Sequence, residues 1–245
     1  MGSAVARGLI ARGCLDPSDI IVATPHPDKL RELSDSGVKI SPSNIDTAKS
    51  DLLIIAVKPW KVKEVVDEIS SSLDFESIEI ALIVAGIKGE ELKSYFKPLP
   101  RVLSIVMPNT AMAIGESMTF IVPLKGKPCL AVDVFKNLGS IKEIEESQLP
   151  AATALASCGI AYALRYVRAA MEGGVEMGFK ANEAQEIICQ TIKGAADLLL
   201  QTNSHPEIEI DKVTTPGGIT IKGLNAMEKF GFSNAVIEGL KASRK

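Results

Sequence analysis

Short, mainly apolar runs recur through the first half of the chain, and most are followed by a stretch with helical spacing. The clearest are DIIVA at 19–23, LLIIAV at 52–57 and the run at 78–85. A strand that is apolar on both faces is buried on both faces, which is typical of a parallel sheet covered by helices on each side. Because crossovers between parallel strands are right-handed, the pattern predicts a doubly wound, Rossmann-like domain.

The strand signals stop after Glu146, and the remaining residues have only helical patterns. Besides the runs above, we predict strands at 38–40, 102–107, 119–122 and 141–144, and helices at 4–12, 28–33, 60–69 and 90–95. Further helices are predicted at 151–177, 182–200, 218–229 and 234–242. The predicted fold class is α/β then all-α, with a dinucleotide-binding Rossmann-like domain at 1–146 and a helical domain at 147–245.

The first residues look like the end of a dinucleotide-binding fingerprint. Met1-Gly2-Ser3-Ala4 matches the last positions of G-x-G-x-x-G, and the strand and two glycines that should precede them are not in the sequence. We therefore expect an N-terminally truncated domain, with two unpaired strand edges and weak binding of NADPH. On the pattern alone, a protein that simply begins with a helix, in which Gly2 is incidental, is an equal alternative.

Composition argues against several classes of partner. The net charge is -3 with no block of basic residues, so neither nucleic acid nor an anionic membrane is an expected partner. The four cysteines are scattered, and with only two histidines beside them no metal site is expected. Scattered thiols, the lack of a signal peptide and the lack of an apolar run long enough to span a bilayer indicate a cytoplasmic protein.

Two predicted strands end in residues suited to a ligand. Lys58 follows the strand at 52–57, and Asn109 follows the strand at 102–107. Ligands of open α/β sheets bind at the carboxyl ends of the strands, so Lys58 and Asn109 are both candidate contacts to the cofactor. A solvated surface lysine and a plain Asn-Thr turn fit the pattern equally well.

The residues after DIIVA bear on the choice of cofactor. No Asp or Glu stands where a carboxylate would bind the ribose hydroxyls of NAD, and Thr24, His26 and Lys29 stand there instead. This neutral-to-basic set suits the 2′-phosphate of NADP, so NADPH is favoured over NADH. A helix-surface lysine and a histidine in a proline turn are the alternative interpretation.

A segment near the C-terminus predicts an accessible helix N-terminus. Thr215, Pro216, Gly217 and Gly218 precede a predicted helix. Such a start leaves backbone N–H groups unhindered and suited to a carboxylate. A capped helix with no ligand is the other interpretation.

Several motifs in order resemble the pyrroline-5-carboxylate reductase family. VTTPGGIT at 213–220 resembles the family signature, in which a Ser usually stands at the position of Thr215. MGSAVARGL at the start, AVKP, MPNT, ASCGIAYAL and EGGVEMGF also resemble family motifs, so the similarity covers essentially the whole chain.

The resemblance implies an enzyme that uses NADPH or NADH to reduce the cyclic imine of pyrroline-5-carboxylate to L-proline, the last step of proline biosynthesis. It also implies that the helical domain dimerises by interlocking with its twin, as a homodimer or within a larger ring. No partner beyond the small-molecule substrate and further copies of the chain is expected.

The resemblance also implies roles for individual residues. Those expected to contact the cofactor are Gly2 by the pyrophosphate, Ala85 and Gly86 near the nicotinamide, and Asn44, Ala56, Val57, Lys58 and Pro59 along the site. Those expected to bind the substrate are the backbone N–H groups of Gly218, Ile219 and Thr220, the hydroxyl of Thr215, and Glu146 from the domain junction. The Thr220 hydroxyl is the candidate proton donor to the ring nitrogen.

Two other functions fit parts of the sequence. One is a different dehydrogenase with the same architecture, of the β-hydroxyacid type, for which Lys193 is a candidate catalytic residue. The other is an N-terminally truncated paralogue that dimerises but does not bind the cofactor.

Overall fold

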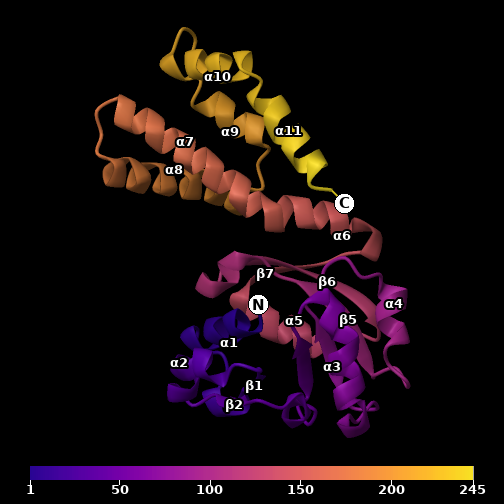
Figure 1. The fold of residues 1–245 in the computed structure, drawn as a ribbon. Helices are drawn as coiled ribbons and strands as arrows, with labels where there is room; N and C mark the ends of the chain where they lie inside the picture. Colours follow the sequence, from indigo (N-terminus) through magenta and orange to yellow (C-terminus); the bar gives the residue numbers. More distant parts are fainter. Residues whose placement is uncertain (245) are drawn as a thin grey trace. The chain divides into compact units, whose positions relative to one another are not determined.

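A computed structural model describes residues 1–244 and divides the chain into two compact units after Ser157. The first unit is α/β and the second is all-helical, so the predicted fold class is confirmed (Figure 1). The domain boundary after Glu146 stays a prediction. A continuous helical stretch, built from α6 (Leu149–Ala152), a π-helical segment (Thr153–Cys158) and α7 (Gly159–Glu176), leads from one unit into the next.

Most elements of the first unit lie within a few residues of their predicted positions. Its strands are β1 (Ile21–Ala23), β2 (Lys39–Ser41), β3 (Leu52–Ile55), β4 (Glu79–Leu82), β5 (Val102–Met107), β6 (Ser117–Lys125) and β7 (Gly139–Glu143). Its helices before α6 are α1 (Gly2–Ala11), α2 (Arg31–Asp35), α3 (Val62–Ile69), α4 (Gly89–Ser94) and α5 (Cys129–Phe135).

The strands form two sheets, β1-β2 and β3-β4-β5-β6-β7. Neighbouring strands are parallel, as predicted, except that β6 runs antiparallel to β5. The prediction of a wholly parallel sheet is wrong at this strand for a simple reason. The connection between β5 and β6 is one short 3₁₀ turn, Thr110–Ile114, whereas parallel neighbours need a crossover of roughly a dozen residues or more.

Within residues 1–244, β1 and β3 each have one edge without a partner strand, as do β2 and β7 at the other ends of the two sheets. β1 pairs only with β2, and β3 pairs only with β4. The free edges of β1 and β3 are the ones that a missing first strand would pair, and that the strand is missing stays a prediction. Each edge leaves backbone N–H and C=O groups outside any ladder.

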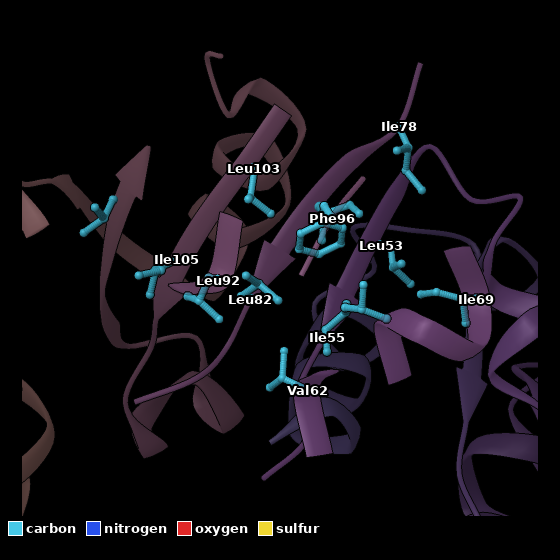
Figure 2. Close-up of a cluster of buried hydrophobic side chains, with 13 residues drawn as sticks. Leu53, Ile55, Val62, Ile69, Ile78, Leu82, Leu92, Phe96, Leu103 and Ile105 are labelled. Atoms are coloured by element: carbon cyan, nitrogen blue, oxygen red, sulfur yellow. The ribbon is translucent and has the colours of Figure 1, made fainter. Parts of the chain in front are cut away.

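Helices cover both faces of the larger sheet. On one face, Val62, Val66 and Ile69 of α3 are fully buried against the sheet, at the i, i+4, i+7 spacing of one helix face. Figure 2 shows this cluster, in which the helical side chains face Leu53, Ile55, Leu82, Leu103 and Ile105 of the strands. On the other face, side chains from α1 and α5 pack against Ala81, Val106 and Ile121. The central strands β4 and β5 are therefore buried on both sides, as their apolar sequence requires.

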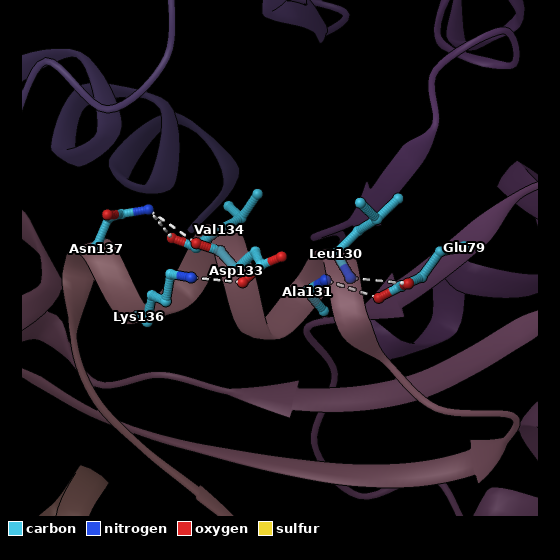
Figure 3. Close-up of polar contacts among 7 residues, drawn as sticks. All are labelled: Glu79, Leu130, Ala131, Asp133, Val134, Lys136 and Asn137. Atoms are coloured by element: carbon cyan, nitrogen blue, oxygen red, sulfur yellow. Dashed lines mark hydrogen bonds and ion pairs between the residues drawn. The ribbon is translucent and has the colours of Figure 1, made fainter.

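α5 was not predicted, and a buried carboxylate explains why it forms. Glu79 is the first residue of β4, and although its side chain is charged it is only 1% exposed. Its carboxylate accepts the backbone N–H groups of Leu130 at 3.0 Å and Ala131 at 2.7 Å, in the first turn of α5 (Figure 3). The N-cap, Pro128, has no side-chain acceptor, so the helix depends on an acceptor from a distant strand. No local sequence pattern reveals such a pair.

The second unit consists of α7, α8 (Ala181–Thr202), α9 (Pro206–Lys212), α10 (Ile219–Lys229) and α11 (Phe232–Ala242). α9 was not predicted, although Pro206 at its first position is a helix-start signal. α7 and α8 approach closely where a Cβ added to Gly174 would lie 2.9 Å from the Ala184 Cβ. Gly174 and Ala184 are the only buried residues between 158 and 244, and every other residue there is partly or largely exposed. The unit therefore has almost no interior of its own.

No helix in the described part of the chain has the length and apolar character needed to cross a lipid bilayer.

We expect Glu79→Ala to lower the free energy of unfolding by about 2–4 kcal/mol, because it leaves two helix-start N–H groups without an acceptor. Chemical denaturation of the purified protein measures this. Ser104→Ala is the control, since the buried Ser104 hydroxyl has no hydrogen-bond partner among the described residues. Its removal should change stability by less than about 0.5 kcal/mol or increase it. Equal losses in the two variants would contradict the role of Glu79.

Candidate active site

The ladder of the larger sheet brings three loops to one edge. Ile55 pairs with Leu82, and Leu82 pairs with Ile105, so the three parallel strands are level at their carboxyl ends. The loops that follow contain Lys58 after β3 and Gly86 after β4. Because these strands run in the same direction, their loops leave the sheet on the same side, where ligands of such sheets bind.

The start of α1 lies against the first of these loops. A Cβ added to Gly2 would be 3.5 Å from the Ala56 Cβ, so the start of α1 lies close to the residue that follows β3. The Met1 carbonyl accepts the N–H groups of Ala4 and Val5, whereas the N–H groups of Gly2 and Ser3 precede the first intrahelical bond. Free N–H groups and the positive end of the helix dipole suit a phosphate at this point.

The loop after β3 presents several exposed side chains. Lys58 is exposed and precedes the 3₁₀ turn Pro59–Lys61, and Trp60 within this turn is 74% exposed. The next lysine, Lys61, is held by Glu64 at 2.6 Å. Ala56 and Val57 are partly buried beneath the loop. The predicted AVKP residues therefore lie together at the candidate site.

The Asn44 amide is already engaged. It donates to Glu68 Oε2 at 2.8 Å, in the last turn of α3. The AVKP loop precedes the first turn of the same helix, so Asn44 contacts the opposite end of α3 from that loop. Its predicted contact with the cofactor stays a prediction, and it would require this hydrogen bond to be exchanged.

Asn109 is buried and has two internal roles. Its side-chain oxygen accepts the Ala111 N–H at 3.0 Å, which caps the 3₁₀ turn after β5. Its side-chain amide donates to the Ala156 carbonyl at 3.3 Å, in the π-helical segment Thr153–Cys158. Asn109 thus ties the end of β5 to that segment, and its predicted contact with the cofactor stays a prediction.

The carboxyl end of β1 carries the residues expected to select the cofactor. The Thr24 hydroxyl accepts the His26 backbone N–H at 3.2 Å, and His26 and Lys29 are both exposed. The neighbouring carboxylate of Asp28 lies 3.9 Å from the Arg31 guanidinium. With Asp28 near Arg31, Lys29 is the charged side chain of this turn that has no neighbouring opposite charge among the described residues. A free positive charge fits an anionic ligand better than a neutral one.

Glu146 contacts the segment that follows β4. Its Oε1 accepts the Gly89 N–H at 2.7 Å, at the first residue of α4. The sequence predicted Glu146 as a substrate contact and did not single out Gly89. The glycine directly before the helix predicted at 90–95 was the only local sign of this close approach.

The start of α10 has the accessible form that the sequence predicts, with one difference. Gly217 has a φ of +70°, and Gly218 N–H donates to the Thr215 carbonyl at 2.9 Å. The Gly218 N–H is therefore used within the turn. The N–H groups of Ile219 and Thr220 are the first in the helix, where no intrahelical acceptor is in reach, and both residues are exposed.

No group of acidic, histidine or cysteine side chains within residues 1–244 is arranged to hold a metal ion.

Two family models match the chain, one in each half. Residues 1–84 match the family described as NADP oxidoreductase coenzyme F420-dependent. Residues 146–245 match the family described as pyrroline-5-carboxylate reductase dimerisation.

Curated proteins from several kingdoms are similar over nearly the whole chain. Pyrroline-5-carboxylate reductase 2 of Dictyostelium discoideum is 35% identical over 99% of this chain and 87% of its own length. The pyrroline-5-carboxylate reductase of Synechocystis is 34% identical over 99% of this chain and 92% of its own length. Pyrroline-5-carboxylate reductase 1 of Dictyostelium discoideum is 38% identical over 99% of this chain, which spans only 47% of that longer protein.

Solved structures agree with these matches. A Plasmodium falciparum pyrroline carboxylate reductase with NADP bound superposes with a TM-score of 0.86 at 26% identity, covering 99% of this chain and 91% of that one. A pyrroline-5-carboxylate reductase from Coxiella burnetii superposes with a TM-score of 0.89 at 25% identity, covering 99% and 92%.

The geometry before α10 makes Gly218 necessary. A Cβ at Gly218 would lie 2.5 Å from the Thr215 Oγ1 and 3.0 Å from its carbonyl oxygen. We expect Gly218→Ala to destabilise the helical unit by about 1–3 kcal/mol. Gly223→Ala is the control, because it lies inside α10 with open space around it. It should stabilise the protein by about 0.5–1 kcal/mol. Denaturation followed by circular dichroism measures the stability of both variants. If both changed the free energy of unfolding in the same direction, the packing of Gly218 against Thr215 would be contradicted.

Proposed function

Because the chain belongs to the pyrroline-5-carboxylate reductase family, we propose that it transfers hydride from NADPH to the cyclic imine of pyrroline-5-carboxylate and releases L-proline. It is an NAD(P)H-dependent oxidoreductase that acts on a C=N bond. The observation that carries the proposal is the start of α10, where a Thr-Pro-Gly-Gly turn precedes accessible N–H groups. Membership of this family decides against the β-hydroxyacid alternative.

The residues at the strand ends fit a dinucleotide. The free N–H groups of Gly2 and Ser3 beside Ala56 suit the pyrophosphate, and the missing side chain of Gly2 leaves room for a close approach. The exposed Lys58 adds a positive charge to the same edge of the sheet. Gly86 follows the neighbouring strand and would lie by the nicotinamide, with Ala85.

NADPH is the preferred cofactor in this proposal. The support is the set after β1, where Thr24, His26 and Lys29 stand and the only carboxylate, that of Asp28, faces Arg31. A carboxylate that could bind both ribose hydroxyls of NADH is not offered there. The charge on Lys29 would instead favour the 2′-phosphate of NADPH.

The start of α10 would bind the substrate. The N–H groups of Ile219 and Thr220 hold the carboxylate, and Gly218 shapes the turn because its own N–H is bonded to Thr215. The Thr220 hydroxyl then hydrogen-bonds the ring nitrogen and supplies the proton that the product amine needs. When bound, the reduced nicotinamide supplies the hydride. The chain contributes by holding the imine carbon in a fixed position, which lowers the entropic part of the barrier.

A homodimer follows from the same proposal. The second unit has only two buried residues among 158–244, and many of its large apolar side chains are exposed, among them Ile187 at 50%, Leu198 at 51% and Leu200 at 81%. Apolar surface of this extent marks an interaction site. A second copy of the chain is the occupant we propose, because residues 146–245 match a dimerisation family. Larger rings of dimers are compatible with it.

We also propose that the protein works in the cytoplasm. All four cysteines, Cys14, Cys129, Cys158 and Cys189, are free thiols. Free thiols are typical of a reducing compartment.

The test of this function is the oxidation of NADPH by the purified protein on addition of pyrroline-5-carboxylate, with proline identified as product. Thr220→Ala should lower kcat by more than about tenfold, because the proton donor is lost. Thr220→Ser keeps the hydroxyl and should retain most of the activity. Activity on 3-hydroxy acids instead, or full activity in Thr220→Ala, would contradict the substrate or the role of the hydroxyl.

The proposed dimer makes a separate prediction. Leu198→Glu places a charge on the exposed apolar face of α8, and we expect it to raise the dimer dissociation constant by about 100-fold or more. Gln185→Glu, at an exposed polar position of the same helix, adds the same charge and should leave the dimer unchanged. Sedimentation velocity over a dilution series measures both. An unchanged constant in Leu198→Glu would exclude this face from the interface.

A further inference from the structure

We propose that Glu146 is a positioning residue: its carboxylate holds the start of α4, and thereby fixes the Ala85-Gly86 turn, without contacting the substrate. The inference rests on the proposed function in one respect, namely that this turn lies by the nicotinamide. The contact itself lies wholly within the first unit and is independent of that function.

The start of α4 lacks a cap from its own sequence. Its N-cap residue is Lys88, whose side chain has no oxygen to accept a backbone N–H. Glu146 supplies that acceptor from far along the chain, at 2.7 Å from the Gly89 nitrogen. A charged acceptor at the positive end of a helix makes a stronger bond than a neutral one.

Position 89 requires a glycine because of the space available around it, and not because of its backbone conformation. Its φ is not positive, so any residue could adopt its conformation. A Cβ at Gly89 would, however, lie 2.5 Å from Glu146 Oε2 and 2.6 Å from the Leu124 Cδ2. Gly89 is buried, so an added methyl group could not turn into solvent. The glycine therefore keeps the carboxylate within hydrogen-bonding distance of the helix.

The turn between β4 and α4 is held at both ends. Ile83 N–H donates to the Ile55 carbonyl at 2.9 Å, which extends the ladder by one residue past β4. At the other end, the Gly89–Glu146 bond fixes the start of α4. Only Ala85 and Gly86 between these points are exposed side by side, and Gly86 has a φ of +82°. The position of this exposed pair therefore depends on the two anchors.

Glu146 itself stands on a fixed turn. It begins the 3₁₀ turn Glu146–Gln148, and a capping box between Glu145 and Gln148 encloses it, with the Glu145 N–H bonded to Gln148 Oε1 at 3.0 Å. The flanking Ile144 and Leu149 pack against the core beside α4. The carboxylate is thus pre-positioned, and its loss should free α4 more than it disturbs its own turn.

Four variants test the proposal. Glu146→Ala removes the acceptor, Glu146→Gln keeps an oxygen without the charge, and Gly89→Ala displaces the carboxylate. Glu90→Ala is the matched control, because it removes a carboxylate from the same helix start that is exposed and bonded to Lys93. Each variant is measured by hydrogen exchange of the peptide covering 83–92 and by separate kcat and KM values for both substrates.

We expect faster exchange at 83–92 in Glu146→Ala and Gly89→Ala, together with a kcat lowered about tenfold or more, since small misplacements are costly to catalysis. KM for pyrroline-5-carboxylate should change less than about threefold, and Glu146→Gln should recover most of the turnover. Glu90→Ala should match the wild type in both readouts.

Two outcomes would overturn the proposal. Unchanged hydrogen exchange at 83–92 in Glu146→Ala would show that Glu146 does not hold the start of α4. Faster exchange with an unchanged kcat would show that the bond has only a structural role. A selective rise of KM for pyrroline-5-carboxylate in both Glu146→Ala and Glu146→Gln would make Glu146 a substrate contact instead. A wild-type protein that does not reduce the imine would contradict the proposed function. The hydrogen-exchange data would still test whether Glu146 holds the start of α4.

Discussion

The ladder that joins β3, β4 and β5 is the constraint on which the first unit depends. It aligns Ile55, Leu82 and Ile105, so three loops leave the sheet level with one another. The same strands are covered on both faces, by α3 and α4 on one side and by α1 and α5 on the other. With both faces buried, the loops at the carboxyl ends of these strands are where the sheet can present side chains to a ligand. The chemistry at this edge is a consequence of how the strands are buried.

The second unit is stabilised differently. Its helices meet closely at Gly174 and Ala184, but nearly every other side chain between 158 and 244 keeps some exposure to solvent. Hydrophobic stabilisation scales with the apolar area removed from water, so a unit this open gains little from its own folding. The homodimer proposed above would add to this stability by covering the exposed apolar side chains of the unit. A turn such as the one before α10 is therefore set by local packing, of Gly218 against Thr215, and not by a core.

The sequence predicted what depends on local pattern, and it failed where distant residues decide. The strand at 102–107 was placed correctly because six apolar or small residues between a charged residue and a proline specify it locally. The predicted direction of β6 was wrong because the direction depends on the length of the connection from β5, not on the residues of the strand. α5 was missed because its cap, Glu79, lies in β4. At the site, the TPGG turn was found from its residues, whereas the bond between Gly89 and Glu146 joins segments whose proximity only the fold creates.

Two helices of the first unit begin in the same way, and their different locations give the same bond different consequences. Lys88 and Pro128 cannot cap α4 and α5, so a distant glutamate accepts the first N–H groups in each case. Glu79 stands at the first residue of β4, at the amino end of the strand and away from the ligand-binding edge. Glu146 holds the helix that follows the carboxyl end of the same strand. We therefore expect loss of the Glu79 bonds to lower stability alone, and loss of the Glu146 bond to alter the backbone beside the ligand-binding loops as well.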